Sequence, residues 1–345
     1  MIFVRVDGNE KIGSGHVMRC LAIANKLRSL GGECVFVVAE HSEMEDVILK
    51  QHFETICLEG SYSDWNQELP AFCELLKKQE PEILLIDSYF ATQDYLNKVS
   101  VFTKVVIIDE HQAMPENCKM IISHGVSCNT SAYEQKFKKN HEGPILLLGP
   151  RYSPLREEFE QTILSPLQKK VKNVLVTTGA TDRLNISGEI IKKVCGDFEE
   201  LEFKIIVGRL NCNLLQLQNL CNQVANAHIE VTPENMMELM CECDLAVSAG
   251  GTTLIELCVC QVPTICFSFV DNQVESVRAF NRVGAMLSAG DFRPSSERFV
   301  EDLKSKLREF TSSFDLRQAC RAKMANLIDG KGCERIAREI LSLVQ

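Results

Sequence analysis

The chain has 345 residues, of which 45% are hydrophobic and 24% charged, and its formal net charge is −10. This length suits two globular domains, and the composition is that of an ordinary globular protein. No run approaches the roughly 18 apolar residues of a membrane helix, and the acidic balance argues against a nucleic-acid-binding protein, which needs a basic face. The opening MIFVRVDGNEK does not resemble a signal peptide, because Arg5 and Asp7 interrupt its short apolar run.

Apolar, β-branched runs alternate with helical patterns through the first half of the chain. Strands are predicted at 2–7, 33–39, 54–59, 82–88, 104–110, 119–125 and 144–149. Helices are predicted at about 15–30, 43–51, 65–79 and 92–100. Continuous apolar strands separated by helices are typical of a parallel sheet that is covered on both faces.

A polar, proline-punctuated stretch at 151–173 separates this half from a second one with the same pattern. Strands are predicted there at 173–178, 203–208, 227–232, 245–250, 263–269 and 285–290. The stretch 315–344 is predicted to be one helix that can pack back on the first domain. The predicted fold is therefore α/β, with two doubly wound Rossmann-like domains, 1–160 and 161–345, that face a central cleft.

Three strands run into a turn of small residues and then a helix, at DGNEKIGSGH (7–16), TTGATDRLN (177–185) and SAGGTTLIELC (248–258). Small residues let backbone N–H groups approach an anion, and a helix N-terminus adds positive potential. Thr252 and Thr253 are expected to cap the helix that carries Glu256. These turns predict a phosphorylated ligand, although glycines that simply end strands would give the same pattern.

Several well-known sites are absent from the sequence. There is no GxxxxGK[ST] motif, GSGHVM lacks the third glycine of a dinucleotide site, and neither HExxH nor GxSxG occurs. The 16 cysteines include no CxxC pair and lie mostly in apolar runs, which favours buried, reduced thiols and a cytoplasmic protein. We therefore expect no metal site and no cofactor, and metal-independent chemistry on a diphosphate.

His16 directly follows the small residues Gly13, Ser14 and Gly15, where a strand turns into a helix. It is either a capping or packing residue or a catalytic base. A helix N-terminus disfavours imidazolium, and a neutral ring can accept a proton from water.

Other polar residues at predicted strand ends are weaker candidates. Asp109 and Glu110 end a strand, and Asp271 precedes Asn272 and Gln273 after another. His111 and His141 lie in predicted loops, whereas His124 ends a predicted strand and is the most favoured of the three to contact a substrate.

Three segments carry a resemblance to a known family: RVDGNEKIGSGHVMRC (5–20), LLLGPRYSPLREEF (146–159) and SAGGTTLIELCVCQVPTICFSFVDNQ (248–273). They resemble the UDP-2,4-diacetamido-2,4,6-trideoxy-β-L-altropyranose hydrolases of pseudaminic acid biosynthesis, with which related spore-coat polysaccharide proteins belong. The likeness runs over roughly residues 1–290. The second half is also similar to the UDP-N-acetylglucosamine transferases that make lipid II.

The resemblance implies a glycosyltransferase-B fold in which the C-terminal domain holds UDP. It implies metal-independent hydrolysis of the bond between a diacetamido-trideoxyhexose and UDP, which is a product. It implies that His16 is the catalytic base. It also implies that Asp87 and Tyr89 correspond to the first and last residues of the family's Asp-His-Tyr motif, although Ser88 stands where the family has a histidine. In the family's Gly-Gly-x-Asp loop, Thr178 replaces the first glycine.

The expected catalytic residues are His16, Asp87 and Tyr89. The expected residues for substrate or UDP binding are Gly13, Gly15, Arg151, Tyr152, Gly179, Asp182, Asn185, Gly250, Gly251, Thr252, Thr253, Glu256, Asn272 and Gln273. The expected partners are a UDP-sugar and water, with no nucleic acid and no membrane insertion. A glycosyltransferase that needs an acceptor, or a non-catalytic nucleotide-sugar binding protein, would fit the same pattern.

Overall fold

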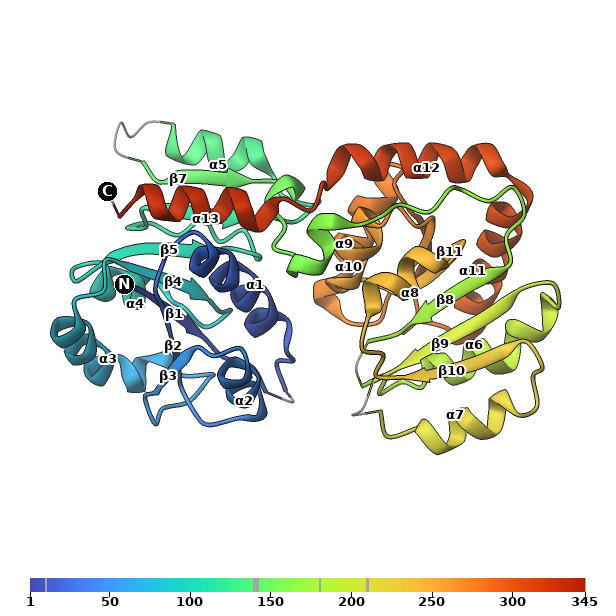
Figure 1. The fold of residues 1–345 in the computed structure, drawn as a ribbon, viewed down its shortest axis with the longest axis horizontal. Coiled ribbons are helices and arrows are strands. Elements are labelled where there is room, and N and C mark those ends of the chain that lie inside the picture. Colours follow the sequence, from blue (N-terminus) through green and yellow to red (C-terminus); the bar gives the residue numbers. More distant parts are fainter. Residues whose placement is uncertain (10, 139–142, 180, 209–210, 345) are drawn as a thin grey trace. The chain divides into compact units, whose positions relative to one another are not determined.

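The computed structural model describes residues 1–344 except 10, 139–142, 180 and 209–210 (Figure 1). It divides into two compact units, Met1–Glu160 with Gly330–Gln345 and Gln161–Asp329. Each unit is a parallel β-sheet with helices packed on it, so the predicted class of two doubly wound α/β domains is confirmed. None of the helices in the described part of the chain combines the length and apolarity that crossing a membrane requires.

The sheet of the first unit has seven strands in the order β3-β2-β1-β4-β5-β6-β7. Its strands are β1 Ile2–Val6, β2 Cys34–Val38, β3 Glu54–Cys57, β4 Ile83–Asp87, β5 Lys104–Ile108, β6 Met120–Ser123 and β7 Ile145–Leu148. Its helices are α1 Gly15–Ser29, α2 Glu43–Lys50, α3 Trp65–Gln79, α4 Gln93–Val99, α5 Thr130–Phe137 and α13 Gly332–Ser342. The chain order reverses direction between β1 and β4, whose carboxyl ends carry the candidate site.

The sheet of the second unit has six strands in the order β10-β9-β8-β11-β12-β13. Its strands are β8 Asn173–Thr177, β9 Glu202–Val207, β10 Ala227–Val231, β11 Leu245–Ala249, β12 Thr264–Ser268 and β13 Leu287–Asp291. Its helices are α6 Ile186–Lys193, α7 Leu214–Cys221, α8 Met236–Glu242, α9 Thr253–Val259, α10 Asp271–Arg282, α11 Ser296–Ser312 and α12 Phe314–Leu327. Short 3₁₀ turns lie at Pro150–Tyr152, Glu157–Gln161 and Cys195–Asp197.

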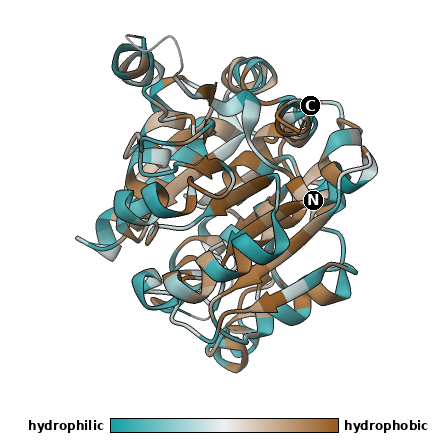
Figure 2. Ribbon diagram, turned by 90° about the vertical axis from the view of Figure 1, so that its left-hand side faces the viewer, coloured by the Kyte–Doolittle hydropathy of each residue, from teal (hydrophilic) through white to brown (hydrophobic). Residues whose placement is uncertain are grey.

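Successive side chains of each strand point to opposite faces of the sheet, and they build a core on each face. In β1, Val4 and Val6 join the core under α1 and α13, whereas Phe3 joins the core under α3 and α4. Hydrophobic residues accordingly gather in the strands, and hydrophilic residues occupy the outer faces of helices (Figure 2). Burial on both faces explains why these strands are continuous apolar runs in the sequence.

The predicted helix at 315–344 is two helices, because the chain leaves the helical path between Leu327 and Gly332. Gly330 takes a φ of +78° in this break, a conformation that favours glycine. The second piece, α13, packs beside α1 in the first unit and buries an apolar face there (Figure 1). Gly332 is needed at its start, because a Cβ atom would overlap the carbonyl oxygen of Ser153.

Candidate functional site

The turn before α1 places His16 in the first turn of that helix. Asn9 organises the turn, because its side-chain oxygen accepts hydrogen bonds from the backbone N–H groups of Lys11 and Ile12 at 2.9 and 3.1 Å. Gly13 then takes a φ of +78°. Gly15 begins α1, its φ is not positive, and an added Cβ there would meet no described atom within 4 Å.

His16, Arg19 and Asp87 form a buried cluster at the carboxyl end of β4. Nδ1 of His16 lies 2.7 Å from Oδ1 of Asp87. Arg19 binds the same carboxylate through two nitrogens, Nε to Oδ2 at 2.5 Å and Nη2 to Oδ1 at 2.6 Å. His16 and Arg19 are three residues apart in α1, so both side chains lie on one face of the helix. The predicted residues His16 and Asp87 are thus brought into direct contact.

The hydrogen bond to Asp87 determines which nitrogen of His16 carries the proton. Nη2 of Arg19 also lies 2.9 Å from Nδ1 of His16, but its better acceptor is the carboxylate. An ionised carboxylate accepts hydrogen bonds only, so we assign the proton to Nδ1, which donates it to Asp87. This leaves the lone pair of Nε2 available to accept a proton.

Tyr89 and Glu110 extend the cluster. Glu110 follows β5 and accepts from Nη1 of Arg19 at 3.1 Å and from the hydroxyl of Tyr89 at 2.5 Å. The Tyr89 ring stands edge-on to the imidazole of His16, with ring centroids 4.5 Å apart. The exposed ring of His111 also contacts Tyr89, with ring centroids 4.2 Å apart. The three predicted catalytic residues therefore lie together.

Arg19 fixes the charges of this cluster. Burial opposes ionisation of Asp87, but the adjacent Arg19 guanidinium outweighs it and holds the pKa of Asp87 well below its usual range. The same balance holds the pKa of Glu110 at about 2, whereas burial and Glu110 raise the pKa of Tyr89. At neutral pH, two carboxylates face one guanidinium, and this surplus negative charge stabilises an imidazolium once His16 takes up a proton.

Arg19 received no role from the sequence, although the His-x-x-Arg spacing was visible there. A pair at i and i+3 on one helix face was the signal that could have found it. Glu110 was only a weak candidate, because its pairing with Arg19 depends on the order of strands in the sheet. Both residues belong to the candidate site in the structure.

Two other polar residues at strand ends behave differently. Asp109 accepts from the backbone N–H groups of Ala113 and Met114 and from the Tyr133 hydroxyl, so it closes a loop. His124 is buried, and neither ring nitrogen has a hydrogen-bond partner among the described residues. Burial, with Arg19 nearby, lowers the pKa of His124 to about 4, so it is neutral at physiological pH. His141 lies outside the described residues.

The loop after β8 in the second unit caps a helix. Gly179 has a φ of +90°, and Asn185, with a φ of +53°, precedes α6. Both carboxylate oxygens of Asp182 accept backbone N–H groups, from Ile186 at 2.8 Å and from Ser187 at 2.9 Å. Asp182 therefore caps the start of α6, and substrate binding by this loop stays a prediction.

The turn between β11 and α9 has a tight part and an open part. A Cβ atom at Gly250 would lie 2.7 Å from Val277 and 2.9 Å from the Gln273 side chain, so glycine is needed for packing against α10. An added Cβ at Gly251 would meet no described atom within 4 Å. The expected capping role is wrong for Thr252, because its backbone is already helical and its side chain makes no cap hydrogen bond.

Other second-unit candidates lie at the start of α10 and in α9. Asp271 begins α10 and pairs with Arg293 at 2.5 Å, and the next residue, Asn272, is exposed. The Gln273 side-chain oxygen accepts from the backbone N–H of Phe269 at 3.1 Å and so closes the strand-to-helix turn. Thr253 begins α9, and Glu256 lies half-buried in its first turn.

Arg151 and Tyr152 help to hold α13 on the first unit. Both lie in the 3₁₀ turn after β7, where Tyr152 packs against the core and Arg151 is exposed. Arg335 of α13 donates to the carbonyl oxygen of Arg151 at 2.8 Å. Their predicted contact with substrate stays a prediction. Among the residues that the structure describes, no group of three or more His, Cys, Asp or Glu side chains is placed to hold a metal ion.

Comparison with known proteins finds no matching family model but several homologues. A spore coat polysaccharide biosynthesis protein, SpsG of Bacillus subtilis, is 23% identical, covering 98% of this chain and 97% of the relative. The UDP-2,4-diacetamido-2,4,6-trideoxy-beta-L-altropyranose hydrolase of Campylobacter jejuni is 22% identical, and the match covers 79% of this chain and 93% of the hydrolase. An N-acetylglucosamine transferase of Clostridium perfringens that uses UDP-N-acetylglucosamine is 21% identical, and the match covers 88% of this chain and 91% of the transferase.

Solved structures share the fold over the whole chain. MurG of Acinetobacter baumannii has a TM-score of 0.69 at 14% identity, covering 99% of both chains. Spinosyn rhamnosyltransferase SpnG has a TM-score of 0.63 at 13% identity, covering 100% of both. The UDP-GlcNAc 2-epimerase of Neisseria meningitidis has a TM-score of 0.63 at 13% identity, covering 99% of this chain and 100% of the epimerase. The fold is therefore that of the glycosyltransferase-B proteins, and proteins with different reactions share it.

Proposed function

We propose that this protein is an enzyme acting on nucleotide sugars, and more specifically a hydrolase that releases UDP from a UDP-2,4-diacetamido-2,4,6-trideoxyhexose. The observation that carries the proposal is His16, whose Nδ1 is held by Asp87 so that Nε2 is left to accept a proton. The name of the Campylobacter relative supports β-L-altropyranose as the sugar, and the name of the Bacillus relative supports a step in the biosynthesis of a surface polysaccharide. Pseudaminic acid biosynthesis is the pathway that the sequence resemblance implies.

In the proposed reaction, Nε2 of His16 takes a proton from a water molecule whose oxygen attacks the anomeric carbon. The bond from that carbon to the diphosphate oxygen breaks, and UDP leaves with the electron pair. Asp87 holds the imidazole in orientation and stabilises the imidazolium, while Arg19 keeps Asp87 ionised. General-base assistance of this kind is typically worth ~10²–10⁴ in rate.

Isotope labelling tests which bond breaks. Turnover in ¹⁸O-water is expected to place the label in the free sugar and to leave UDP unlabelled, because UDP is a stable leaving group and water attacks carbon. Mass spectrometry of both products is the measurement, with unreacted UDP-sugar in the same water as the control. Label in UDP would show attack at phosphorus and would overturn the proposed mechanism.

A second candidate, a UDP-sugar glycosyltransferase, is favoured by the transferase relative that spans most of this chain. Assays without an acceptor separate the two functions. Sustained UDP release in water supports the hydrolase, whereas release that requires an added sugar or lipid acceptor supports the transferase. Binding of the nucleotide sugar without any release would support a non-catalytic binding protein.

UDP recognition we assign to the second unit, at the turn Gly250–Thr253 and at Glu256. A carboxylate can accept hydrogen bonds from both ribose hydroxyls, and Glu256 lies half-buried in the first turn of α9. Replacing Glu256 with Ala is expected to weaken UDP binding about tenfold or more, consistent with the loss of charge-assisted hydrogen bonds. Calorimetry with a chelator present measures the affinity and also tests the expected independence from divalent metal.

Glu242→Ala is a matched control, because Glu242 is an exposed carboxylate just before β11, at the opposite end of that strand from α9. It is expected to bind UDP like the wild type. Unchanged affinity in Glu256→Ala would remove Glu256 from the ribose site. Loss of wild-type binding on chelation would reject the metal-independent site.

A further inference from the structure

A second pair of aromatic side chains adjoins the catalytic cluster at the carboxyl edge of the first sheet. Phe90 follows Tyr89 directly in the chain, and the Tyr89 ring contacts His16. The ring of Tyr62 lies 6.0 Å from that of Phe90, with the two planes 78° apart. Both rings are only half-buried. Partly exposed ring surface therefore lies at the same end of the sheet as the proposed base, on the segment that also carries Tyr89.

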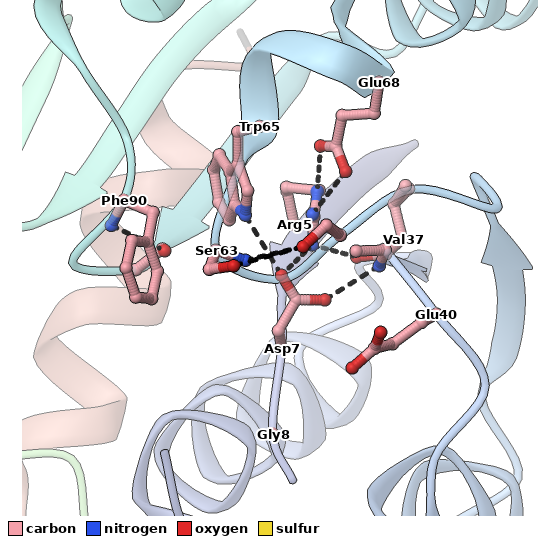
Figure 3. A network of polar contacts seen from close by, with 12 residues as sticks. Arg5, Asp7, Gly8, Val37, Glu40, Ser63, Trp65, Glu68 and Phe90 are labelled. Carbon is pink, nitrogen blue, oxygen red and sulfur yellow. Dashed lines mark hydrogen bonds and ion pairs between the residues drawn. The ribbon is translucent and has the colours of Figure 1, made fainter. Parts of the chain in front are cut away.

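A buried ionic network holds the segment that carries Tyr62 (Figure 3). Arg5 of β1 is fully buried and donates to both oxygens of Glu68 at 2.8 Å, and it pairs with Asp7 at 2.8 Å. Trp65 donates from Nε1 to Asp7 at 3.1 Å, and the Arg5 guanidinium lies 4.0 Å over its ring. This network anchors the start of α3, and Tyr62 lies three residues before it.

Phe90 is held by its own local contact. Its backbone N–H donates to the hydroxyl of Ser88 at 3.0 Å, which shapes the turn after β4 (Figure 3). On the Tyr62 side, the backbone N–H of Asp64 donates to the carbonyl oxygen of Ser61 at 3.2 Å and closes a turn around Tyr62. Backbone turns that are already ordered lose little conformational freedom when a ligand packs on the side chains that they carry.

Lys11 lies at the outer rim of this pair. Its ammonium nitrogen is 5.8 Å from the centroid of the Tyr62 ring, near the limit of a cation–π contact, and its side chain is exposed. Such a long, solvated side chain can leave the ring at little cost in free energy. The aromatic surface is therefore accessible to a ligand.

We propose that Tyr62 and Phe90 form a sugar-binding platform that receives the methyl-bearing part of the substrate. The inference rests on the proposed hydrolase function and names the group that its sugar site selects. Aromatic rings bury C–H and methyl groups favourably but cannot satisfy a hydroxyl. A 2,4-diacetamido-6-deoxy sugar presents three methyl groups, whereas N-acetylglucosamine presents one and carries a hydroxymethyl group instead.

Steady-state kinetics with two nucleotide sugars test the platform. Phe90→Ala and Tyr62→Ala are each expected to lower kcat/KM for the UDP-diacetamido sugar about tenfold, mainly through KM, while UDP alone binds unchanged. Preference over UDP-N-acetylglucosamine is expected to fall by a similar factor. Tyr62→Phe and Phe90→Tyr, which keep the rings, are expected to stay within about twofold of the wild type.

Phe102→Ala is the matched control, because Phe102 is a half-buried ring just before β5, at the opposite edge of the same sheet. It is expected to leave KM and the preference unchanged. An unchanged KM in Phe90→Ala and Tyr62→Ala, or an equal loss with both nucleotide sugars, would overturn the platform while leaving the hydrolase intact.

Saturation-transfer NMR separates this proposal from the function on which it rests. The His16→Asn background is expected to bind the nucleotide sugar and to turn it over at least about a hundredfold more slowly. In this background the acetamido methyl protons should receive the strongest saturation, and adding Phe90→Ala should at least halve that saturation. If the wild type hydrolyses no nucleotide sugar, the hydrolase proposal fails and this binding readout still tests the platform. Equal methyl saturation in His16→Asn with and without the Phe90→Ala substitution would reject the platform.

Discussion

Replacing His16 with Asn is expected to lower kcat by at least about a hundredfold, because general-base assistance is typically worth ~10²–10⁴ in rate. Asparagine is similar in size and can still contact Asp87, but it cannot take a proton from water at neutral pH. Asp87 also keeps its two hydrogen bonds from Arg19, so the fold should survive. UDP release from a saturating UDP-sugar is the measurement, together with calorimetry for UDP.

The control for this prediction is His41→Asn. His41 lies before α2 in the same unit, its side chain is 76% exposed, and its partner is Glu45. The control is expected to retain wild-type kcat. If His16→Asn retains wild-type kcat as well, or if the variant does not fold, His16 is a packing residue and the proposed mechanism fails.

Replacing Arg19 with Met is expected to destabilise the first unit by about 3–5 kcal/mol at neutral pH, the range observed when one partner of a buried ion pair is removed. The cost falls mainly on Asp87, whose side chain is 1% exposed and would lose its cation. Glu110 contributes less because it is partly exposed. Trp65 is the single tryptophan of the sequence and is buried in this unit, so its fluorescence in urea follows the unfolding of this unit.

The effect of Arg19→Met should depend on pH in a defined direction. In the folded wild type, Arg19 outweighs burial and holds the pKa values of Asp87 and Glu110 below their usual ones. Their stabilising contribution is therefore complete above the unfolded pKa of about 4 and is lost as pH falls toward the folded values. The loss caused by the variant should be largest near pH 7 and should shrink below about pH 4.

Arg338→Met provides the comparison, because Arg338 pairs with Glu334 on the exposed face of α13. A surface pair of this kind is worth about 0–1 kcal/mol, so this variant should unfold almost as the wild type does. Equal losses at pH 3 and pH 7 in Arg19→Met would mean that its side chain contributes by packing and not by charge.

The strands were predictable to within one or two residues because parallel strands buried on both faces must be continuously apolar. The short helix α5 was missed, since TSAYEQKF offers only two large apolar side chains to the core, Tyr133 and the partly buried Phe137. The break before α13 was missed for another reason. Apolar residues recur at helical spacing on both sides of Gly330, and the close approach to Ser153 that requires Gly332 exists only in the folded unit.

The candidate site was predictable where a residue's task depends on a local motif. His16 follows from the turn at the end of β1, whereas Asp87 and Tyr89 follow from the resemblance to a known family, and the structure places the three together. Roles that depend on contacts with residues far away in the sequence were not predictable. Arg19 reaches two strand ends at once, and the expected cap at Thr252 fails because of a backbone conformation that the sequence does not specify.

The assignment of α13 to the first unit has a consequence for biosynthesis. The buried residues Cys333, Ile336, Ala337 and Ile340 complete a core whose other members lie before residue 161. A ribosome makes all of Gln161–Asp329 before it makes this helix. The first unit therefore has an uncovered apolar face beside α1 while the second unit is synthesised, and transiently exposed apolar surface of this kind favours aggregation of a nascent chain.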